Sequence, residues 1–165
     1  MISITNLNKS IEHTTSSSPL PSHNFVNDPH YLKIASHNVR SFNDSFKQKF
    51  LTNLYLLNNL DIIGLQETNF NTNKDASLLR FTLPPSFIPF LEHNQSRQQV
   101  GFGVGLLIKK HLANHIYKHA GNLGRYIYVD LQFPARFKIR IINVYLSSSN
   151  TPLRTQTIKE VSKII

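Results

Sequence analysis

The fold of this chain is decided by the stretch Asp61-Ile62-Ile63-Gly64-Leu65-Gln66-Glu67-Thr68. Its apolar run has the length of one buried β-strand and ends abruptly in the carboxylate of Glu67. A buried strand that delivers an acid to its C-terminal end holds that acid in a fixed position, which a metal site requires. We therefore expect Glu67 at the edge of a sheet, as a metal ligand or as a solvated strand end.

A strand and a helix are predicted before this stretch. The residues that lead up to Asn38 are mostly apolar and predict a strand that ends there. A helix is expected next, with Ser45 and Gln48 as a capping box. Spacings of 4, 4 and 3 give this helix an apolar face of Phe46, Phe50, Leu54 and Leu57, which Leu51 and Leu60 widen. A right-handed crossover would place both strands in one sheet, with Asn38 and Glu67 at the same edge and with or without a strand between them.

The rest of the chain predicts strands more than helices. Residues 68–77 are expected to form a polar loop, and residues 78–91, which contain three prolines, edge strands or irregular cover. Residues 100–108 predict a buried strand, and residues 126–145 a hairpin with period-2 alternation. A last helix is expected to open with Thr151 as its N-cap.

The composition indicates one basic domain with a leader. Residues 1–29, rich in Ser, Thr, Asn and Pro, predict a disordered leader, and residues 30–165 a domain. The net charge of +9 favours polyanionic partners, nucleic acid before an anionic membrane. The absence of cysteine from the sequence excludes disulfides, thiolate catalysis and Cys-bound metals. Since no transmembrane run and no signal peptide are recognisable, we expect an intracellular protein without a membrane partner, in the nucleus or the cytoplasm.

Three motifs resemble the endonuclease/exonuclease/phosphatase superfamily, which includes deoxyribonuclease-I-like and apurinic-endonuclease-like enzymes. Residues 34–40 (Ile-Ala-Ser-His-Asn-Val-Arg) resemble its first strand, which ends in N-V-R. Residues 61–68 resemble its D-I-I-x-L-Q-E-T motif, and residues 141–145 (Ile-Ile-Asn-Val-Tyr) resemble its x-x-N-V-Y-x-P motif. The whole is most similar in character to the endonuclease domains of LINE-type retrotransposons.

The resemblance implies an α/β fold, the N-terminal part of a four-layer α/β/β/α sandwich that is truncated at its C-terminus. It implies hydrolysis of phosphodiester bonds in nucleic acid, DNA more than RNA, with Mg²⁺ or Mn²⁺ and no small-molecule cofactor; the oligomeric state stays open. Glu67 would ligate the metal, Asn38 would ligate it or orient its ligands, and Tyr145 would contact the scissile phosphate. Arg40 and Arg125 would bind phosphates of the nucleic acid; a surface or hairpin salt link is the other interpretation of Arg125.

Two motifs of the superfamily have no counterpart in this sequence. They are its catalytic Asp-x-Asn and its Ser-Asp-His, which supplies the histidine that engages the phosphate. We therefore expect the 165-residue chain by itself to be inactive as a nuclease. Two alternatives remain open: a non-catalytic basic protein that binds nucleic acid, and a phosphatase of the same superfamily that acts on phosphoinositides or other small phosphoesters.

Overall fold

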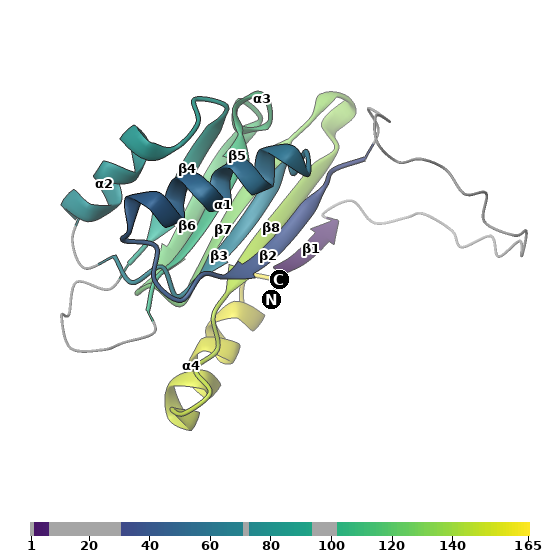
Figure 1. Cartoon of the computed structure of the whole chain (residues 1–165). Helices are drawn as coiled ribbons and strands as arrows, with labels where there is room; N and C mark the ends of the chain where they lie inside the picture. The colour runs from purple at the N-terminus through teal and green to yellow at the C-terminus, as the bar shows by residue number, and fades with distance from the viewer. Residues whose placement is uncertain (1, 7–30, 71–72, 94–101) are drawn as a thin grey trace, which may run out of the picture.

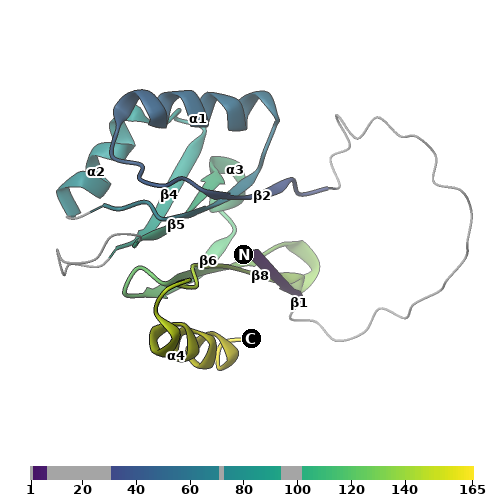
Figure 2. The ribbon, with the colours of Figure 1, turned by 60° about the horizontal axis from the view of Figure 1, so that its bottom comes forward.

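Two four-stranded β-sheets face each other, and helices cover their outer faces, which gives the layers α/β/β/α (Figure 1, Figure 2). The computed structural model describes residues 2–6, 31–70, 73–93 and 102–165. The four-layer sandwich expected from the sequence is confirmed. None of the helices in the described part of the chain has the length and apolar character that crossing a membrane requires.

The first sheet has the strand order β2-β3-β5-β4, formed by β2 (Ile34–Asn38), β3 (Ile62–Gln66), β5 (Val104–Lys109) and β4 (Phe87–Glu92). Its outer face is covered by α1 (Ser45–Leu57) and α2 (Asn73–Thr82). β2 and β3 are direct parallel neighbours, because α1 makes the crossover between them. β4 is an edge strand, the position in a sheet that tolerates Pro89.

The second sheet has the strand order β1-β8-β7-β6, formed by β1 (Ile2–Asn6), β8 (Lys138–Val144), β7 (Tyr126–Gln132) and β6 (Ile116–Asn122). β7 and β8 form the predicted hairpin, closed by the 3₁₀ turn Pro134–Arg136. The short helix α3 (Lys110–Ala113) joins the two sheets, and α4 (Thr151–Ser162) covers the outer face of the second. The core between the sheets is built from Ile62, Leu106, Ile108, Val129, Leu131 and Ile141, all buried.

The predicted disordered leader is wrong at its start. Residues 2–6 form β1, which pairs antiparallel with β8 in the register Ile2↔Asn143 to Asn6↔Ile139. The sequence gives no sign of this strand because a single edge strand of five residues depends on its partner β8 for its hydrogen bonds. Residues 7–29 of the predicted leader lie outside the described residues.

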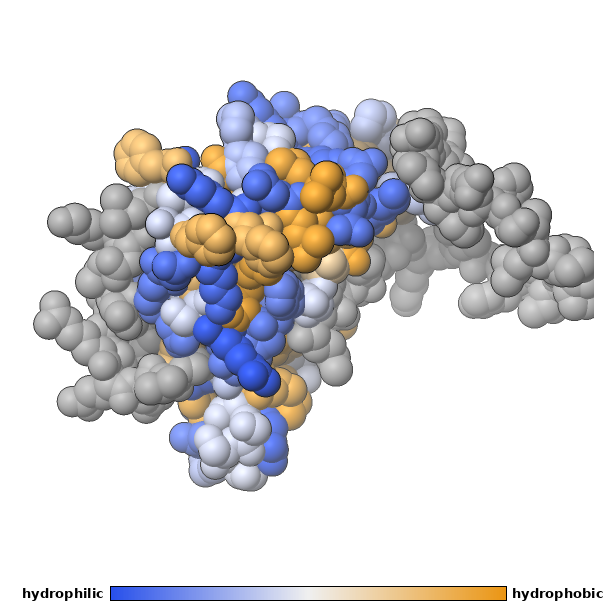
Figure 3. Space-filling model, viewed as in Figure 1, coloured by the Kyte–Doolittle hydropathy of each residue, from blue (hydrophilic) through white to orange (hydrophobic). Residues whose placement is uncertain are grey.

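The predicted apolar face of α1 is also wrong for its four main residues, although Leu51, at the margin of that face, is buried. Phe46 and Phe50 are 78% and 61% exposed, and Leu54 and Leu57 are exposed as well. Figure 3, which looks onto α1, shows hydrophobic residues gathered on this outer surface. The helix instead packs on the sheet through the buried residues Gln48, Leu51, Thr52 and Tyr55.

The polar side chains on this buried face find partners inside the protein. Gln48 donates through Nε2 to the carbonyl of Phe42 and accepts from the hydroxyl of Thr82. Thr52 donates to the carbonyl of Gln48 at 2.7 Å. Because these hydrogen bonds offset the cost of burying polar groups, the helix can turn Gln48 and Thr52 inward. The spacing of apolar residues in the sequence does not reveal this orientation.

The exposure of the apolar residues of α1 leads to a testable prediction. Phe50→Ser should change the free energy of unfolding by less than about 0.5 kcal/mol, because the ring is exposed. The neighbouring Leu51→Ala should lower it by about 2–5 kcal/mol, because that side chain is in the core. Urea denaturation of both variants measures the difference. A larger cost for Phe50→Ser than for Leu51→Ala would mean that the apolar stripe packs inward.

Two helix caps and one whole helix also differ from the prediction. Asp44, and not Ser45, caps α1, since its side chain accepts a hydrogen bond from the backbone N–H of Lys47 at 2.6 Å. Asn150, and not Thr151, caps α4 in the same way. Residues 73–82 form the helix α2 where loop and irregular cover were expected. A helix of only three turns carries too few apolar positions for its period to stand out.

Candidate active site at the strand ends

The loops that follow β2 and β3 are held together by backbone hydrogen bonds. Val39 N–H donates to the carbonyl of Gln66 at 2.9 Å, and Ser41 N–H donates to the carbonyl of Glu67 at 2.7 Å. Asn38 and Glu67 therefore lie at the same edge of the first sheet, as the parallel strand pair predicts. We call this end of the molecule, where Asn38, Glu67 and Tyr145 lie, the metal edge.

Four residues of these loops adopt left-handed backbone conformations, and one of them is Asn69, with a φ of 55°. Arg40, Ser41 and Glu67 have φ angles of 44°, 78° and 55°. Such conformations cost of order 1 kcal/mol each for residues other than glycine and persist only where surrounding contacts enforce them. Here the paired loops supply those contacts, so that the carboxylate of Glu67 leaves the strand in a fixed direction.

Glu67 and Asn38 are in direct contact. The side-chain amide of Asn38 donates from Nδ2 to Oε1 of Glu67 at 2.8 Å, and its Oδ1 accepts from the backbone N–H of Arg40 at 3.1 Å. Since Oδ1 is held by a backbone donor, the amide nitrogen is turned toward the carboxylate. In this arrangement Asn38 orients Glu67.

Tyr145 reaches the same carboxylate from the second sheet. Burial and then a hydrogen bond with Glu67 raise the pKa of Tyr145, and the nearby Arg125 opposes this rise. The phenol therefore stays protonated at neutral pH, and its O–H donates to the carboxylate. Glu67 is oriented by one donor from each sheet.

Arg125 lies beside Tyr145 at the start of β7 and is only 6% exposed. Its guanidinium carbon lies 3.7 Å from the centre of the Phe102 ring and 5.5 Å from that of Tyr145. Two of its nitrogens, Nε and Nη1, are buried without a hydrogen-bond partner in the described structure, and burial lowers the pKa of the group. A buried cation with unused donors is a receptor for an anion.

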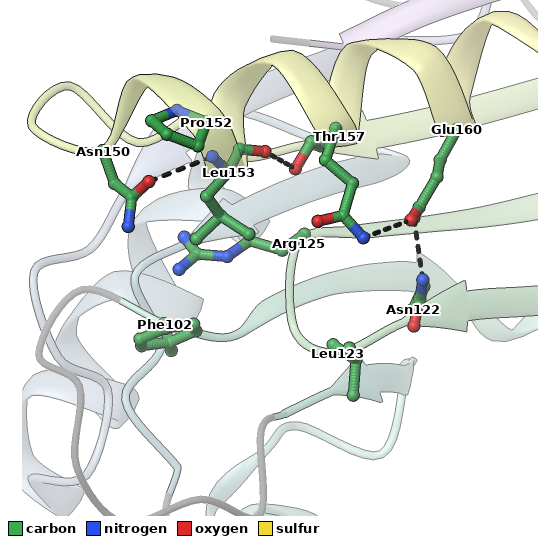
Figure 4. Close-up of a pocket in the computed structure, with 10 residues that line it drawn as sticks. Phe102, Asn122, Leu123, Arg125, Asn150, Pro152, Leu153, Thr157 and Glu160 are labelled. Atoms are coloured by element: carbon green, nitrogen blue, oxygen red, sulfur yellow. Dashed lines mark hydrogen bonds between the residues drawn. The ribbon is translucent and has the colours of Figure 1, made fainter.

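The guanidinium of Arg125 also lines a recess of about 420 Å³ between the β6–β7 turn and the start of α4. Figure 4 shows it between the first turn of α4 and the ring of Phe102. The opposite wall is fixed by Asn122, which donates to Glu160 at 2.7 Å. Because Arg125 also lies beside Tyr145, an anion bound by Arg125 would lie close to the metal edge.

A buried amide pair joins the two sheets directly beneath Glu67. Asn143 donates from Nδ2 to the carbonyls of Leu65 and Gly105, both at 2.8 Å, and its Oδ1 accepts from Nε2 of Gln66. This pair fixes the distance between β3, which carries Glu67, and β8, which leads to Tyr145. Both amides stand inside sequence motifs, but no role was predicted for them; the signal in the sequence is a polar residue at an inward position of each strand.

The donor atoms at the metal edge suit a hard divalent cation. Glu67 offers a carboxylate, and magnesium typically uses one or two carboxylates together with water and phosphate oxygens. Among the described residues, no group of three or more His, Asp or Glu side chains comes together that could hold a metal without such help. A metal here would therefore depend on Glu67 and on oxygens that come from solvent or substrate.

Four of the five predicted site residues come together at this edge: Asn38, Glu67, Arg125 and Tyr145. The fifth, Arg40, is exposed, and it contacts Asn38 through its backbone N–H and not through its guanidinium. Phe102, which stacks on Arg125, was not predicted. Only the folded chain brings it to Arg125.

His37 gives the site region a pH dependence. Burial and the nearby Lys47 lower the pKa of His37, and its Nδ1 lies 2.7 Å from the hydroxyl of Tyr55. As the pH falls below about 6.5, the unfolded chain binds a proton that the folded protein resists, so the free energy of unfolding should fall. Denaturation between pH 7.5 and about 5 should show this loss, and His37→Gln should reduce it. His111→Gln, at an exposed position, is the control and should leave the loss unchanged.

The architecture and the site together define an α/β sandwich that presents oxygen ligands and a buried arginine at one end of its strands. The chain matches the model of the endonuclease/exonuclease/phosphatase family over residues 35–158. Among solved structures it is similar to the AP endonuclease LMAP from Leishmania major, with a TM-score of 0.57 and 15% sequence identity. This similarity covers 76% of the chain and 43% of that enzyme. No curated protein sequence matches it significantly.

The chain therefore belongs to the endonuclease/exonuclease/phosphatase family. It spans less than half the length of the Leishmania enzyme, and at this identity the similarity concerns the fold. The superfamily and the sandwich predicted from the sequence are both confirmed.

Proposed function

We propose that this chain contributes the metal-binding edge of a phosphodiesterase that cleaves nucleic acid with Mg²⁺ or Mn²⁺. The observation that carries the proposal is the oriented carboxylate of Glu67, which receives one hydrogen bond from Asn38 and one from Tyr145. Membership of the family and the fold of an AP endonuclease support phosphoester hydrolysis as the chemistry. The net charge of +9 favours nucleic acid as the substrate, and the similarity to an AP endonuclease favours DNA before RNA.

Each residue of the site has a separate task in this proposal. Glu67 would hold the metal, and a bound Mg²⁺ supplies charge stabilisation to the phosphoryl oxygens. Asn38 and Tyr145 would keep the carboxylate in one orientation, so that little reorganisation is needed when the substrate arrives. Arg125 would hold a phosphate through Nε and Nη1, which have no other partner in the described structure. The side chain of Arg40, exposed beside Asn38, would attract the phosphates of the nucleic-acid backbone.

The second candidate is a basic protein that binds nucleic acid without cleaving it. It is favoured because, among the described residues, no group of three or more His, Asp or Glu side chains gathers around Glu67 to hold a metal. In this case the metal edge would contact a phosphate but would have no group to activate water. The two candidates share a binding surface and differ in turnover.

Metal binding and nicking by the Glu67→Gln variant test the proposal. Titration with Mn²⁺, followed by calorimetry, should show one site in the parent chain and at least a hundredfold weaker binding in the variant. Asn53→Asp, which adds a carboxylate on the exposed side of α1, is the control and should retain the site. Equal Mn²⁺ binding by parent and Glu67→Gln would contradict the proposal.

Supercoiled plasmid incubated with Mg²⁺ separates the two candidates. Nicking by the parent chain that disappears in Glu67→Gln would support the phosphodiesterase and would contradict the expectation from the sequence that the chain by itself is inactive. Salt-sensitive binding of the plasmid without nicking supports the binding protein only if the chain also fails to bind Mn²⁺ through Glu67, because the chain by itself is expected not to turn over. Hydrolysis of a soluble phosphoinositide, without nicking, would indicate the phosphatase chemistry of the same family.

A further inference from the structure

The end of the sandwich opposite to the metal edge carries a second surface, which we call the hairpin patch: Tyr117, Lys118, Phe133, Arg136, Phe137 and Lys138. It surrounds the β7–β8 turn and the start of β6. The pair Gln132↔Lys138 lies at this end of the hairpin, and the pair Tyr126↔Val144 lies next to Tyr145 at the other. Since β7 is seven residues long, the two ends are about 20 Å apart.

Acidic side chains are unevenly divided between the two ends. Of the carboxyl side chains that the structure describes, four lie at the metal edge: Asp44, Glu67, Glu92 and Glu160. The other two lie toward the hairpin patch, and each is ion-paired within the protein: Asp61 with Lys109 at 3.1 Å, and Asp130 with Arg140 at 2.6 Å. Lys118 and Lys138 are therefore in no ion pair with a described carboxylate side chain.

Aromatic rings are interleaved with these cations. Tyr117 is 50% exposed and Phe137 is 39% exposed. The Nζ of Lys138 lies 5.2 Å from the centre of the Tyr117 ring. Phe133 joins His115 to Phe137 in a tilted stack, with ring centres 4.8 Å and 6.2 Å apart. Exposed flat rings between cations are the pattern by which proteins hold single-stranded nucleic acid, since bases stack on rings while phosphates meet lysine and arginine.

We propose that the hairpin patch binds single-stranded nucleic acid, with a base stacked on Tyr117 or Phe137 and phosphates held by Lys118, Arg136 and Lys138. A duplex hides the faces of its bases and could use only the cations. Two partly exposed rings offer too little apolar surface to enter a membrane. This surface goes beyond the proposed function, because it would hold a strand about 20 Å away from Glu67.

The charge variants test the proposal through the salt dependence of binding. The measurement is fluorescence anisotropy of a labelled oligothymidine of about 12 nucleotides, with EDTA present and in the Glu67→Gln background, so that neither cleavage nor metal contributes. Lys118→Gln/Arg136→Gln should weaken binding and should lower the slope of log K against log salt by about 1.4. Lys49→Gln/Lys159→Gln removes the same charge at exposed positions of α1 and α4 and should leave the slope nearly unchanged.

The ring variants test the stacking. Tyr117→Ala should weaken oligothymidine binding about tenfold, whereas Tyr117→Phe should preserve it. Unchanged thermal melting of each variant establishes that the fold is intact. Equal salt slopes for the two charge variants would overturn the proposal. So would a duplex that binds as tightly as the single strand, if Tyr117→Ala weakens the binding of neither ligand.

Two further anionic ligands test whether the hairpin patch binds something other than nucleic acid. Polyglutamate or phosphatidylserine vesicles that compete with the oligonucleotide at equal charge concentration, and that lose binding in Tyr117→Ala, would overturn the assignment to nucleic acid. Binding of the oligonucleotide at the hairpin patch is measured independently of the metal edge. Failure of Mn²⁺ binding or nicking would remove the proposed function and leave the hairpin patch in place, and loss of the patch would leave the metal site in place.

Discussion

Asn143→Ala is expected to lower the free energy of unfolding by roughly 3–5 kcal/mol, because it removes one side chain that satisfies three buried partners. Asn143 is fully buried, donates to the carbonyls of Leu65 and Gly105, and accepts from Gln66. In the variant, the buried side chain of Gln66 loses Oδ1 of Asn143 as its acceptor. The space left by the asparagine side chain is then either filled by water or empty. Chemical denaturation with urea measures the change.

The same substitution should also affect the site. Since Asn143 links β3 to β8, its loss should loosen the position of Tyr145 relative to Glu67. Mn²⁺ affinity should therefore fall by about tenfold even at temperatures at which the variant is folded. Asn53→Ala, at an exposed position of α1, is the control for an asparagine removed from the surface and should change the unfolding free energy by less than about 0.5 kcal/mol. Equal unfolding free energies for the two variants would mean that the buried amide contributes no stability.

Asp130→Ala is expected to cost about 3–5 kcal/mol of unfolding free energy, since it leaves a cation without its partner inside the protein. Asp130 is 1% exposed in its side chain and receives two hydrogen bonds from Arg140, at 2.6 Å from Nε and 2.7 Å from Nη2. Arg140 also lies over the Tyr128 ring, with its guanidinium carbon 4.6 Å from the ring centre, and donates to the carbonyl of Ile164. The pair therefore joins β7 and β8 to the segment that follows α4.

A double substitution separates the attraction of the pair from the cost of burying it. Asp130→Leu/Arg140→Leu should be much less destabilised than Asp130→Ala, because two apolar side chains leave no charge unpaired. Thermal melting of the single and the double variant gives the comparison. A double variant as unstable as Asp130→Ala would mean that the ion pair itself, rather than the unpaired guanidinium, holds the hairpin to α4.

The strand ends that carry the site residues could be predicted from the sequence, because residues close along the chain determine where each strand ends. The apolar run before Glu67 sets a buried strand, and the crossover helix between Asn38 and Glu67 places both residues at one edge. The alternation from Tyr126 to Val144 sets the hairpin and brings Tyr145 to its end. In each case the pattern of apolar residues fixes which atoms are buried, and the backbone geometry of a strand fixes where the next polar residue must lie.

Other features depend on partners that are distant along the chain. The orientation of α1 was not predictable from its spacing, because Gln48 and Thr52 can face inward only where Phe42 and Thr82 supply partners. β1 needs β8, and its sequence alone gives no strand signal that outweighs the polar residues around it.

What the sequence determined by itself is the family and the strand that carries Glu67. The tertiary structure decided what surrounds that carboxylate: the amide of Asn38 that orients it, the phenol of Tyr145 that reaches it from the other sheet, and the stack of Arg125 on Phe102 beside it. It also decided the division of charge between the metal edge and the hairpin patch. The physical reason is that strand formation follows from residues a few positions apart, whereas hydrogen bonds, ring contacts and ion pairs between sheets exist only once the two sheets have packed.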